Sequence, residues 1–298
     1  MKTALLIPCH NAAAYLPRLW QTVRAQTRPF DAVFCYDDAS EDNTAAVAEA
    51  LGAQVIRSES NGGPARARNA LLHACQAEWV HFHDADDLLT PGYHARVSAD
   101  ADEGTDAVLC NALWRDETTG AEVMAWRYSN DTLRRDPVGY LLTHPVGGIN
   151  GYYRRTALVD VGGFDERLRV WEDADLHVRL AQHGKRLRVV EEDLVIALRR
   201  ADSQSAPAAN NWRNRLLALR SYAGQLAPTH HVPLQAELER CTRELVRAGD
   251  TASAREAIAL TRRLGGDPPS TDNALLKLLK RVAGPLTAFR IQAAVRKS

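Results

Sequence analysis

The sequence lacks paired cysteines, long apolar runs and an excess of charge of either sign. Its five cysteines are scattered and form no Cys-x-x-Cys pair, so we expect neither a zinc knuckle nor a disulfide framework. No run of about 18 apolar residues occurs, which excludes an obvious membrane-spanning helix. The first residues turn polar too soon for a secretory signal peptide. These absences predict a globular protein of the reducing cytoplasm.

The balanced net charge conceals two parts of opposite sign. The 298 residues carry 37 Lys and Arg and 37 Asp and Glu. Residues 206–298 carry 15 basic and 7 acidic side chains, a net charge of +8, and residues 1–205 therefore carry −8. The acidic part excludes a nucleic-acid channel there and suits a divalent metal. We place a domain boundary between residues 205 and 206, within a polar linker rich in Ala, Ser and Pro.

The first 90 residues alternate short apolar runs with helix-like stretches. Buried strands are predicted at residues 4–7, 32–36, 54–56 and 79–83, with helices over 14–26, from about 42 to 51, and over 64–77. This order predicts an α/β domain with a doubly wound, mostly parallel sheet. Ligands of such sheets bind at the carboxyl ends of the strands.

The pattern changes after residue 105. We expect strands at residues 107–110, 187–190 and 194–198, a hairpin around residues 118–120, a flexible bend at 147–151, and helices near 154–161 and 172–183. Beyond the linker the sequence reads as helical over about 212–226, 233–248, 252–264 and 273–296. The chain is therefore expected to combine an α/β domain over residues 1–205 with a helical region over 206–298.

Three carboxylates occur within the four residues Asp84-Ala85-Asp86-Asp87, directly after a predicted buried strand. They repel one another unless a cation lies among them, and Mg²⁺ or Mn²⁺ prefers such oxygen ligands. The alternative is a solvated acidic turn in which Asp87 caps the next helix.

Two further segments follow predicted strands. Asp37 and Asp38 can accept a hydrogen bond from a base or a ribose, or they can belong to a helix N-cap cluster. Residues 61–64, Asn-Gly-Gly-Pro, open a helix whose first N–H groups suit a diphosphate, with Arg68 one turn further on. An ordinary strand-to-helix turn explains this second segment equally well.

The predicted helix over residues 172–183 begins with three acidic side chains. The helix dipole alone favours acidic residues in the first turn. Asp175 and Arg179 form an i,i+4 pair with a structural role. Asp173, if it points back toward the strand ends, can serve as a general base.

Six motifs occur in order: residues 7–11 (Ile-Pro-Cys-His-Asn), 37–40 (Asp-Asp-Ala-Ser), 61–69, 83–87, 161–165 (Val-Gly-Gly-Phe-Asp) and 171–176 (Trp-Glu-Asp-Ala-Asp-Leu). This series resembles the family 2 glycosyltransferases of the GT-A fold over about residues 3–205. The resemblance implies a nucleotide-sugar donor, usually a UDP-sugar, and inversion at the anomeric carbon. It also implies a glycan, a lipid-linked molecule or another hydroxyl compound as acceptor, in polysaccharide biosynthesis.

Site residues follow from the resemblance position by position. For the nucleotide, it implies that Pro8 and His10 line the pocket, that Asp38 contacts the base with Asp37 beside it, and that Arg68 lies near the donor phosphates.

The same resemblance implies the chemistry. Asp84 and Asp86 match the DxD motif, with Asp86 as the direct ligand of Mn²⁺ or Mg²⁺, and Asp173 matches the carboxylate that deprotonates the acceptor hydroxyl. The family often has Arg-x-His near residue 200, where residues 199–205 contain no histidine.

Two other functions remain open at this point. A nucleotidyltransferase also places carboxylates and metal on an α/β sheet, but it releases pyrophosphate. A degenerate GT-A-like scaffold would bind partners without catalysis. In the C-terminal region, residues 273–298 interleave leucines with basic side chains. They suit either a peripheral contact with the inner face of an anionic membrane or a helix packed on the catalytic domain or on a second subunit.

Overall fold

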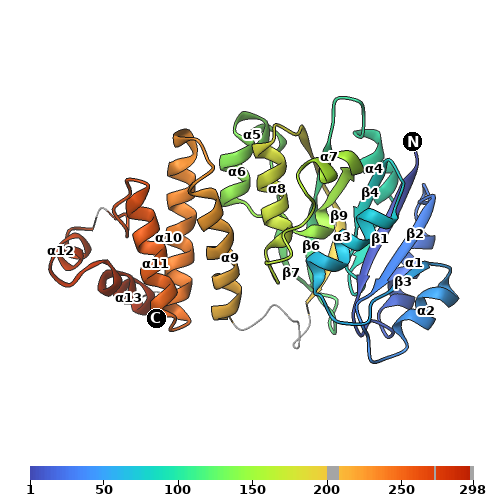
Figure 1. The fold of residues 1–298 in the computed structure, drawn as a ribbon, viewed down its shortest axis with the longest axis horizontal. Helices are drawn as coiled ribbons and strands as arrows, with labels where there is room; N and C mark the ends of the chain where they lie inside the picture. Colours follow the sequence, from blue (N-terminus) through green and yellow to red (C-terminus); the bar gives the residue numbers. More distant parts are fainter. Residues whose placement is uncertain (200–207, 272, 296–298) are drawn as a thin grey trace. The chain divides into compact units, whose positions relative to one another are not determined.

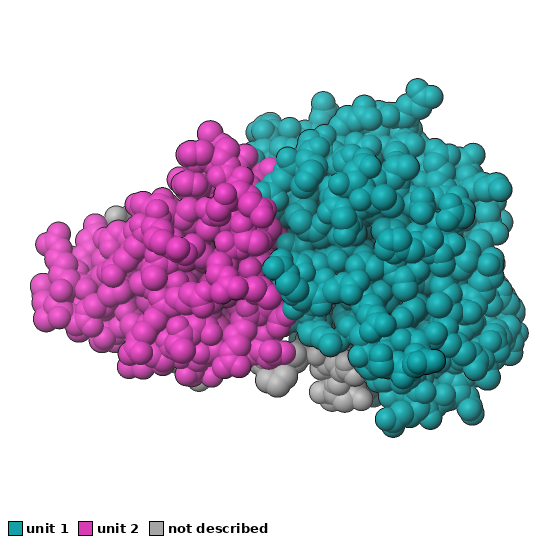
Figure 2. Space-filling view, in the orientation of Figure 1, with its two compact units in different colours: residues 1–137, 144–203 teal, residues 138–143, 204–298 magenta. Residues whose placement is uncertain are grey.

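The computed structural model describes residues 1–199, 208–271 and 273–295 of the chain. It divides into two compact units, one made of residues 1–137 and 144–203 and the other of residues 138–143 and 204–298 (Figure 2). The boundary predicted between residues 205 and 206 lies outside the described residues. The short segment 138–143 joins the helical unit, which no feature of the sequence predicted.

The first unit is built on one mixed sheet (Figure 1). Its strand order is β3 (Gln54–Arg57), β2 (Ala32–Asp37), β1 (Thr3–Cys9), β4 (Trp79–Phe82), β8 (Gly151–Arg154), β6 (Ala107–Asp116), β9 (Leu187–Arg199) and β5 (Leu88–Leu89). The strands β1 to β4 run parallel, β8 runs antiparallel to both neighbours, and β6 and β9 are parallel again. The predicted mostly parallel, doubly wound sheet is confirmed.

Helices connect these strands as the sequence pattern predicts. The crossovers are α1 (Leu16–Arg24), α2 (Thr44–Leu51) and α3 (Pro64–Ala74), and the later helices are α7 (Arg155–Asp160) and α8 (Glu172–Gln182). Two short helices, α4 (Tyr93–Ala99) and α5 (Asn130–Arg135), were not predicted. The core around β1 explains the parallel arrangement, because residues 4–7 are fully buried and leave no solvent-facing side of this strand.

Two separate strands were expected at residues 187–190 and 194–198. In the structure these residues form the single strand β9, which pairs with β6 along its length. The register shifts between Cys110 and Ala112, so that Cys110 faces Val190 while Asn111 faces Asp193. The intervening polar residues Glu191 and Glu192 bulge out of the ladder, which explains why they interrupted the apolar pattern. The hairpin expected around residues 118–120 joins β6 to β7 (Glu122–Trp126).

The second unit is helical. It contains α6 (Pro137–Thr143) from residue 138 on, α9 (Ala208–Tyr222), η2 (Pro228–His230), α10 (His231–Arg247), α11 (Thr251–Arg263), α12 (Ala274–Ala283) and α13 (Pro285–Val295). The helix predicted over residues 273–296 is two helices, because Gly284 takes a positive φ of 83° and Pro285 starts the second. Within the described part of the chain, no helix has the length and apolar character needed to cross a membrane.

Candidate active site

The acidic turn after β4 holds its three carboxylates in different surroundings. Asp87 is buried, and its carboxylate accepts a hydrogen bond of 2.8 Å from the Leu198 backbone N–H of β9. The turn leads into β5, so Asp87 fixes the loop to the sheet and caps no helix. Asp84 and Asp86 remain partly exposed at the carboxyl edge of the sheet. The turn therefore presents two of its three acidic groups to solvent.

Arg68 links this turn to the start of α8. It is buried on α3, and its Nη2 donates to Asp84 Oδ1 at 2.7 Å while its Nη1 donates to Glu172. Burial lowers the pKa of the guanidinium, but the charges of Asp84, Glu172 and Asp173 outweigh it and raise the pKa overall. Arg68 is thus a permanent positive charge that offsets the carboxylates around it. The resemblance placed it near the donor phosphates, and in the structure its two terminal nitrogens are held by protein carboxylates.

Asp173 lies in the first turn of α8, beside this ion pair. Its Oδ2 accepts the backbone N–H of Gly148 at 2.8 Å, and its Oδ1 accepts the N–H of Ala174 at 2.7 Å. Burial raises the pKa of the Asp173 carboxyl, against the opposing effects of Arg68 and of the two backbone donors. The two donors fix the orientation of this carboxylate, and its pKa shifts in the direction that general-base catalysis requires.

The Gly148 donor comes from η1 (Gly148–Asn150), in the segment that the sequence analysis expected to be a flexible bend. Residues 147–150 are buried. A Cβ added at Gly147 would lie 2.6 Å from the Trp126 ring, so the glycine there is required by close packing. The segment is a packed turn that positions Asp173.

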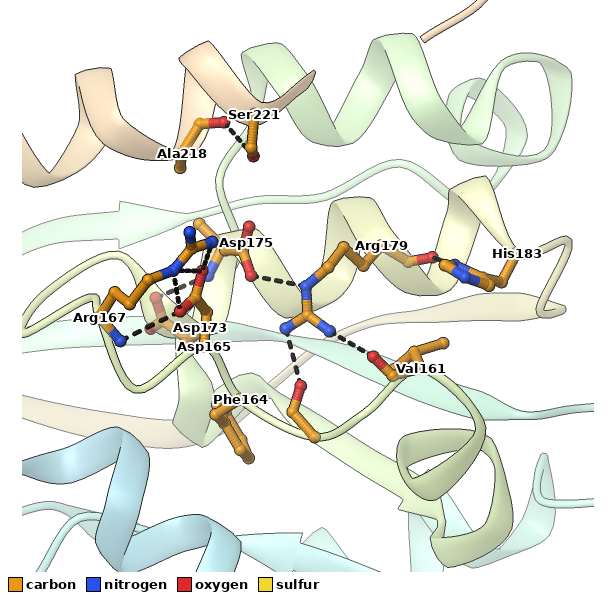
Figure 3. Close-up of polar contacts among 12 residues, drawn as sticks. Val161, Phe164, Asp165, Arg167, Asp173, Asp175, Arg179, His183, Ala218 and Ser221 are labelled. Atoms are coloured by element: carbon orange, nitrogen blue, oxygen red, sulfur yellow. Dashed lines mark hydrogen bonds and ion pairs between the residues drawn. The ribbon is translucent and has the colours of Figure 1, made fainter. Parts of the chain in front are cut away.

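The α8 helix is anchored by Arg179, as Figure 3 shows. Its Nε donates to Asp175 at 2.7 Å, and its two terminal nitrogens donate to the carbonyls of Val161 and Gly163 at 2.8 and 2.7 Å. The i,i+4 pair was predicted to be structural, and the structure confirms it. Because the anchor spans α8 and the loop after α7, it fixes where the first turn of α8, and so Asp173, lies.

Asp38 organises the glycine turn before α3. Its Oδ1 accepts the backbone N–H of Gly62 at 2.8 Å, and its Oδ2 accepts that of Gly63 at 2.7 Å. The Asp38 side chain is buried, whereas the sequence suggested the glycine N–H groups for a diphosphate and Asp38 for a base. In this structure the two features satisfy each other.

The remaining predicted nucleotide residues lie around the ends of β1 and β2. Pro8 and Tyr36 are register partners in these parallel strands. The exposed His10 ring lies 3.0 Å from the Asp38 carbonyl through Nδ1. Asp37 is buried and accepts the Ser40 N–H at 3.1 Å, as a local turn cap does. The sheet edge thus brings all the predicted nucleotide residues to neighbouring strand ends and the adjacent helix α3.

Three residues near the site escaped the sequence analysis. Glu172 was treated only as a helix-dipole residue, yet it is the buried partner of Arg68. Gly148 supplies the backbone donor to Asp173. The Arg169 guanidinium lies beside the start of α3, since a Cβ at Gly63 would be 2.3 Å from its Nη1. Glu172 could have been found from its position next to Asp173, but a backbone donor and a loop arginine leave no sequence pattern.

The acidic turn offers a donor set that fits a hard divalent metal. Asp84 and Asp86 supply carboxylate oxygens, and the side chain of Asp84 is 40% exposed although one oxygen bonds Arg68. Among the described residues no cluster of three or more His, Cys, Asp or Glu side chains is arranged to hold a metal alone. Mg²⁺ and Mn²⁺ commonly take one or two carboxylates and complete their shell with phosphate oxygens and water. The two aspartates therefore suit a metal that arrives with a diphosphate.

Comparison with known sequences points to one family. The Glycosyl transferase family 2 profile matches residues 4–162. The succinoglycan biosynthesis protein ExoU of Rhizobium meliloti is 27% identical over 219 residues, which cover 67% of this chain and 63% of ExoU. The pre-mycofactocin glycosyltransferase of Mycobacterium tuberculosis is 30% identical over 194 residues, covering 62% of this chain and 40% of that protein. Each match spans less than two thirds of the relative.

Solved structures share the fold at lower sequence identity. Staphylococcus aureus TarS superposes with a TM-score of 0.69 and 20% identity, covering 97% of this chain and 54% of TarS. A TarS fragment of residues 1–349 bound to UDP-GlcNAc has a TM-score of 0.61 and 19% identity, covering 92% of this chain and 95% of the fragment. The mannosyltransferase PcManGT of Pyrobaculum calidifontis, bound to GDP-Man and Mn²⁺, has a TM-score of 0.62 and 19% identity, covering 99% of this chain and 86% of PcManGT. The sheet and its helices are thus those of the GT-A fold.

Proposed function

Because the chain belongs to glycosyl transferase family 2, we propose that it transfers a sugar from a nucleoside-diphosphate sugar to a hydroxyl acceptor, with inversion at the anomeric carbon. The observation that carries the proposal is the Arg68 bridge. It joins Asp84, in the acidic turn after β4, to Glu172, the neighbour of Asp173. The bridge thus supports a site in which the proposed metal ligand Asp84 and the proposed base Asp173 lie at one edge of the sheet.

A UDP-sugar is the first donor to test. TarS was solved with UDP-GlcNAc, and the Asp38 and His10 positions lie at the sheet edge where a base would bind. Each Asp38 oxygen accepts one backbone N–H and keeps a further lone pair for a ligand donor. PcManGT was solved with GDP-Man, so a guanine nucleotide is the second donor to test.

The donor phosphates need positive charge and hydrogen-bond donors. Asp84 and Asp86 would hold Mn²⁺ or Mg²⁺, which when bound would offset the charge that develops on the departing diphosphate. The side chains of Arg66 and Arg169 lie beside Gly62 and Gly63 at the start of α3 and would add positive charge there, while the carboxylates engage Arg68. Such fixed charges act where negative charge grows in the transition state.

The transfer is a single displacement. The acceptor oxygen attacks the anomeric carbon, the bond from that carbon to the phosphate oxygen breaks, and the nucleoside diphosphate leaves. Asp173 takes the proton of the acceptor hydroxyl. Its two backbone donors orient the carboxylate, and its raised pKa strengthens it as a base. No second carboxylate nucleophile is required, in contrast to retaining glycoside hydrolases.

The acceptor class follows from the relatives. ExoU is named for succinoglycan biosynthesis and GgaB of Bacillus subtilis for minor teichoic acid biosynthesis. We therefore propose a glycan or a lipid-linked glycan as the acceptor. We propose that the protein is located in the cytoplasm, where nucleotide sugars are available. Its five cysteines are free and buried, which fits a compartment that keeps thiols reduced.

Titration calorimetry with UDP, GDP, CDP and dTDP, each with and without Mn²⁺, tests the donor site. We expect one diphosphate to bind in a metal-dependent way and Asp86→Asn to abolish the metal dependence. The exposed Asp131 on α5 provides the matched control, because Asp131→Asn removes the same charge away from the turn. No binding of any diphosphate would overturn the donor site and favour the scaffold function.

Asp173→Asn separates binding from catalysis. We expect unchanged diphosphate affinity and a loss of about 10²–10⁴-fold in sugar transfer, or in donor hydrolysis before the acceptor is known. Wild-type rates in this variant would exclude Asp173 as the base. Release of pyrophosphate from a nucleoside triphosphate and a sugar phosphate would instead establish the nucleotidyltransferase.

A further inference from the structure

The helical unit contains an arginine-lined pocket that the transfer chemistry does not use. It has a volume of about 640 Å³ and lies between α11 and the bend that joins α12 to α13. Arg255, Arg262 and Arg290 line it, together with the apolar side chains of Ile258 and Leu286. Three guanidinium groups around one pocket favour a phosphate, which arginine binds through two parallel hydrogen bonds.

These arginines are available to a ligand. All three are exposed, and Arg290 Nη2 donates a hydrogen bond of 3.3 Å to the Thr251 hydroxyl. The nearest acidic residue along α11, Glu256, pairs with Arg220 on α9 at 3.2 Å. No carboxylate of a described residue neutralises Arg255 or Arg262, so the pocket keeps its positive charge.

An exposed apolar strip on α12 leads to the same pocket. Leu275, Leu278 and Val282 lie three and four residues apart, so they share one face of the helix, and they are 64, 58 and 78% exposed. Leu276 and Leu279, on another face, are half-buried. Packing of α12 within its unit therefore uses Leu276 and Leu279 and leaves the apolar strip exposed. It ends at Val282, which directly precedes two residues that line the pocket, Ala283 and Gly284.

The charges beside the strip have one sign. Residues 273–298 contain no acidic side chain, and Arg281 is exposed next to Val282. Lys280 is already engaged by Asp267 at 2.7 Å, which ties α12 to the segment before it. Leucine and valine side chains surrounded by basic residues are typical of helices that lie in the interface of an anionic bilayer.

We propose that this surface binds an anionic phospholipid membrane, with a lipid phosphate in the pocket of Arg255, Arg262 and Arg290. The apolar strip Leu275, Leu278 and Val282 enters the boundary between headgroups and acyl chains. The occupant is a bilayer because the exposed aliphatic side chains of α12 continue directly into residues that line the arginine pocket, whereas a free phosphate would need only the pocket. The inference does not depend on the donor site.

Co-sedimentation of the full chain with vesicles tests the proposal. We expect binding to phosphatidylcholine vesicles that contain phosphatidylglycerol, weak binding to phosphatidylcholine alone, and a decline as salt rises. Arg255→Gln with Arg262→Gln should weaken binding about 25-fold, from roughly fivefold for each charge near the surface. The single variant Arg262→Gln has a matched control in Arg263→Gln, which removes the same charge from an exposed neighbour on α11 that does not line the pocket.

The apolar strip has its own control. Leu278→Gln should reduce binding about tenfold, from an apolar contribution of roughly 1.5 kcal/mol. Val232→Gln on α10, which is 72% exposed and outside the strip, should leave binding unchanged. Equal binding to both vesicle types, no binding to either, or wild-type binding of the double arginine variant would overturn the proposal.

Two other occupants give distinct results. Calorimetric binding of inorganic phosphate without vesicle binding would make the pocket a site for a soluble anion and overturn the membrane proposal. A dimer in light scattering without lipid, converted to monomer by Leu278→Gln, would assign the strip to a second copy of the chain and overturn it as well. Urea unfolding of each variant shows that the fold is intact.

Discussion

The Arg68 guanidinium donates to the Glu172 carboxylate, and both side chains are buried. The contact joins α3 to the first turn of α8, across 104 residues of sequence. Breaking a buried pair by removing one partner is costly because the other charge is left uncompensated. Asp84 shares the same guanidinium, so Arg68 links the acidic turn to the first turn of α8, which carries Asp173.

We expect Glu172→Gln to alter how stability depends on pH. Burial raises the pKa of Glu172 from 4.5 to about 7, against the opposing charge of Arg68. Between pH 4.5 and about 7, the Glu172 carboxyl holds a proton in the native chain and releases it in the unfolded chain. The contribution of Glu172 to the free energy of unfolding therefore decreases as pH rises through this range. Urea unfolding across the window should show wild type losing stability relative to the variant, with no further change above about pH 7.

The control for this prediction is Glu49→Gln. Glu49 and Arg57 form an exposed ion pair, with side chains 51 and 59% exposed. Such pairs contribute ~0–1 kcal/mol, so this variant should stay within that range of wild type at every pH. Parallel stability curves for wild type and Glu172→Gln would contradict the predicted titration.

Asp38→Asn is expected to loosen the turn before α3. The carboxylate accepts two backbone N–H groups, from Gly62 and Gly63, and an asparagine oxygen replaces only one of its two oxygens. The N–H left unsatisfied should lower the free energy of unfolding by ~1–3 kcal/mol, measured by urea denaturation, and weaken diphosphate binding in calorimetry.

The neighbouring Asp37 provides the control, because it tests whether replacing any carboxylate at this strand end has the same effect on stability as Asp38→Asn. Asp37 accepts one N–H, from Ser40, which the oxygen of an asparagine can still accept. Asp37→Asn should therefore destabilise the chain less than Asp38→Asn. Equal losses would show that charge at the strand end, rather than the paired hydrogen bonds, stabilises the turn.

The strands of the first unit could be predicted because their burial is visible in the sequence. Residues 4–7 are uniformly apolar since both sides of β1 are covered, and the following turn residues mark where the strand ends. The order of strand and helix then determines that Asp38 and Asp84 come to one sheet edge. The carboxylates Asp37, Asp38, Asp84 and Asp86 were found because they lie at or directly after the ends of strands.

Contacts distant in sequence could not be predicted in this way. Asp38 accepts backbone N–H groups of a turn 24 and 25 residues later, a contact that its own sequence neighbourhood does not indicate. The backbone N–H of Gly148, which donates to Asp173, could not be predicted because every residue except proline has such a group. Segment 138–143 packs with the helical unit because it supplies the Leu142 carbonyl to buried Arg215, a contact that no local pattern encodes.

Gly163→Ala should be more destabilising than an alanine at a glycine in open space. Gly163 has a φ of 68°, and a Cβ there would lie 2.5 Å from Asn69 Oδ1. That oxygen accepts the Phe164 N–H at 2.8 Å, so the clash breaks the contact between α3 and the loop before α8. We expect a loss of at least ~2 kcal/mol in urea unfolding.

Gly120→Ala separates backbone strain from the clash. Gly120 has a similar φ of 70°, with nothing within 4 Å of an added Cβ. Its loss should be only the left-handed strain, about 1 kcal/mol. If both variants lose the same free energy, then Asn69 moves aside without cost and the loop is not held by it.

In the helical unit, Arg215→Met should be strongly destabilising and Arg215→Met with Glu237→Leu should recover stability. Arg215 on α9 is fully buried, its Nε donates to Glu237 Oε1 on α10 at 2.9 Å, and its Nη2 donates to the Leu142 carbonyl at 2.8 Å. The single variant leaves the Glu237 carboxylate, which is 2% exposed, with the more distant Arg240 at 3.7 Å as its cation among the described residues. We therefore expect Arg215→Met to lose about 3–5 kcal/mol in the free energy of unfolding. The double variant places an apolar pair of similar volume there, which needs no charge compensation. Urea unfolding of wild type, both single variants and the double variant completes the cycle, and a double variant no more stable than Arg215→Met would contradict the predicted recovery.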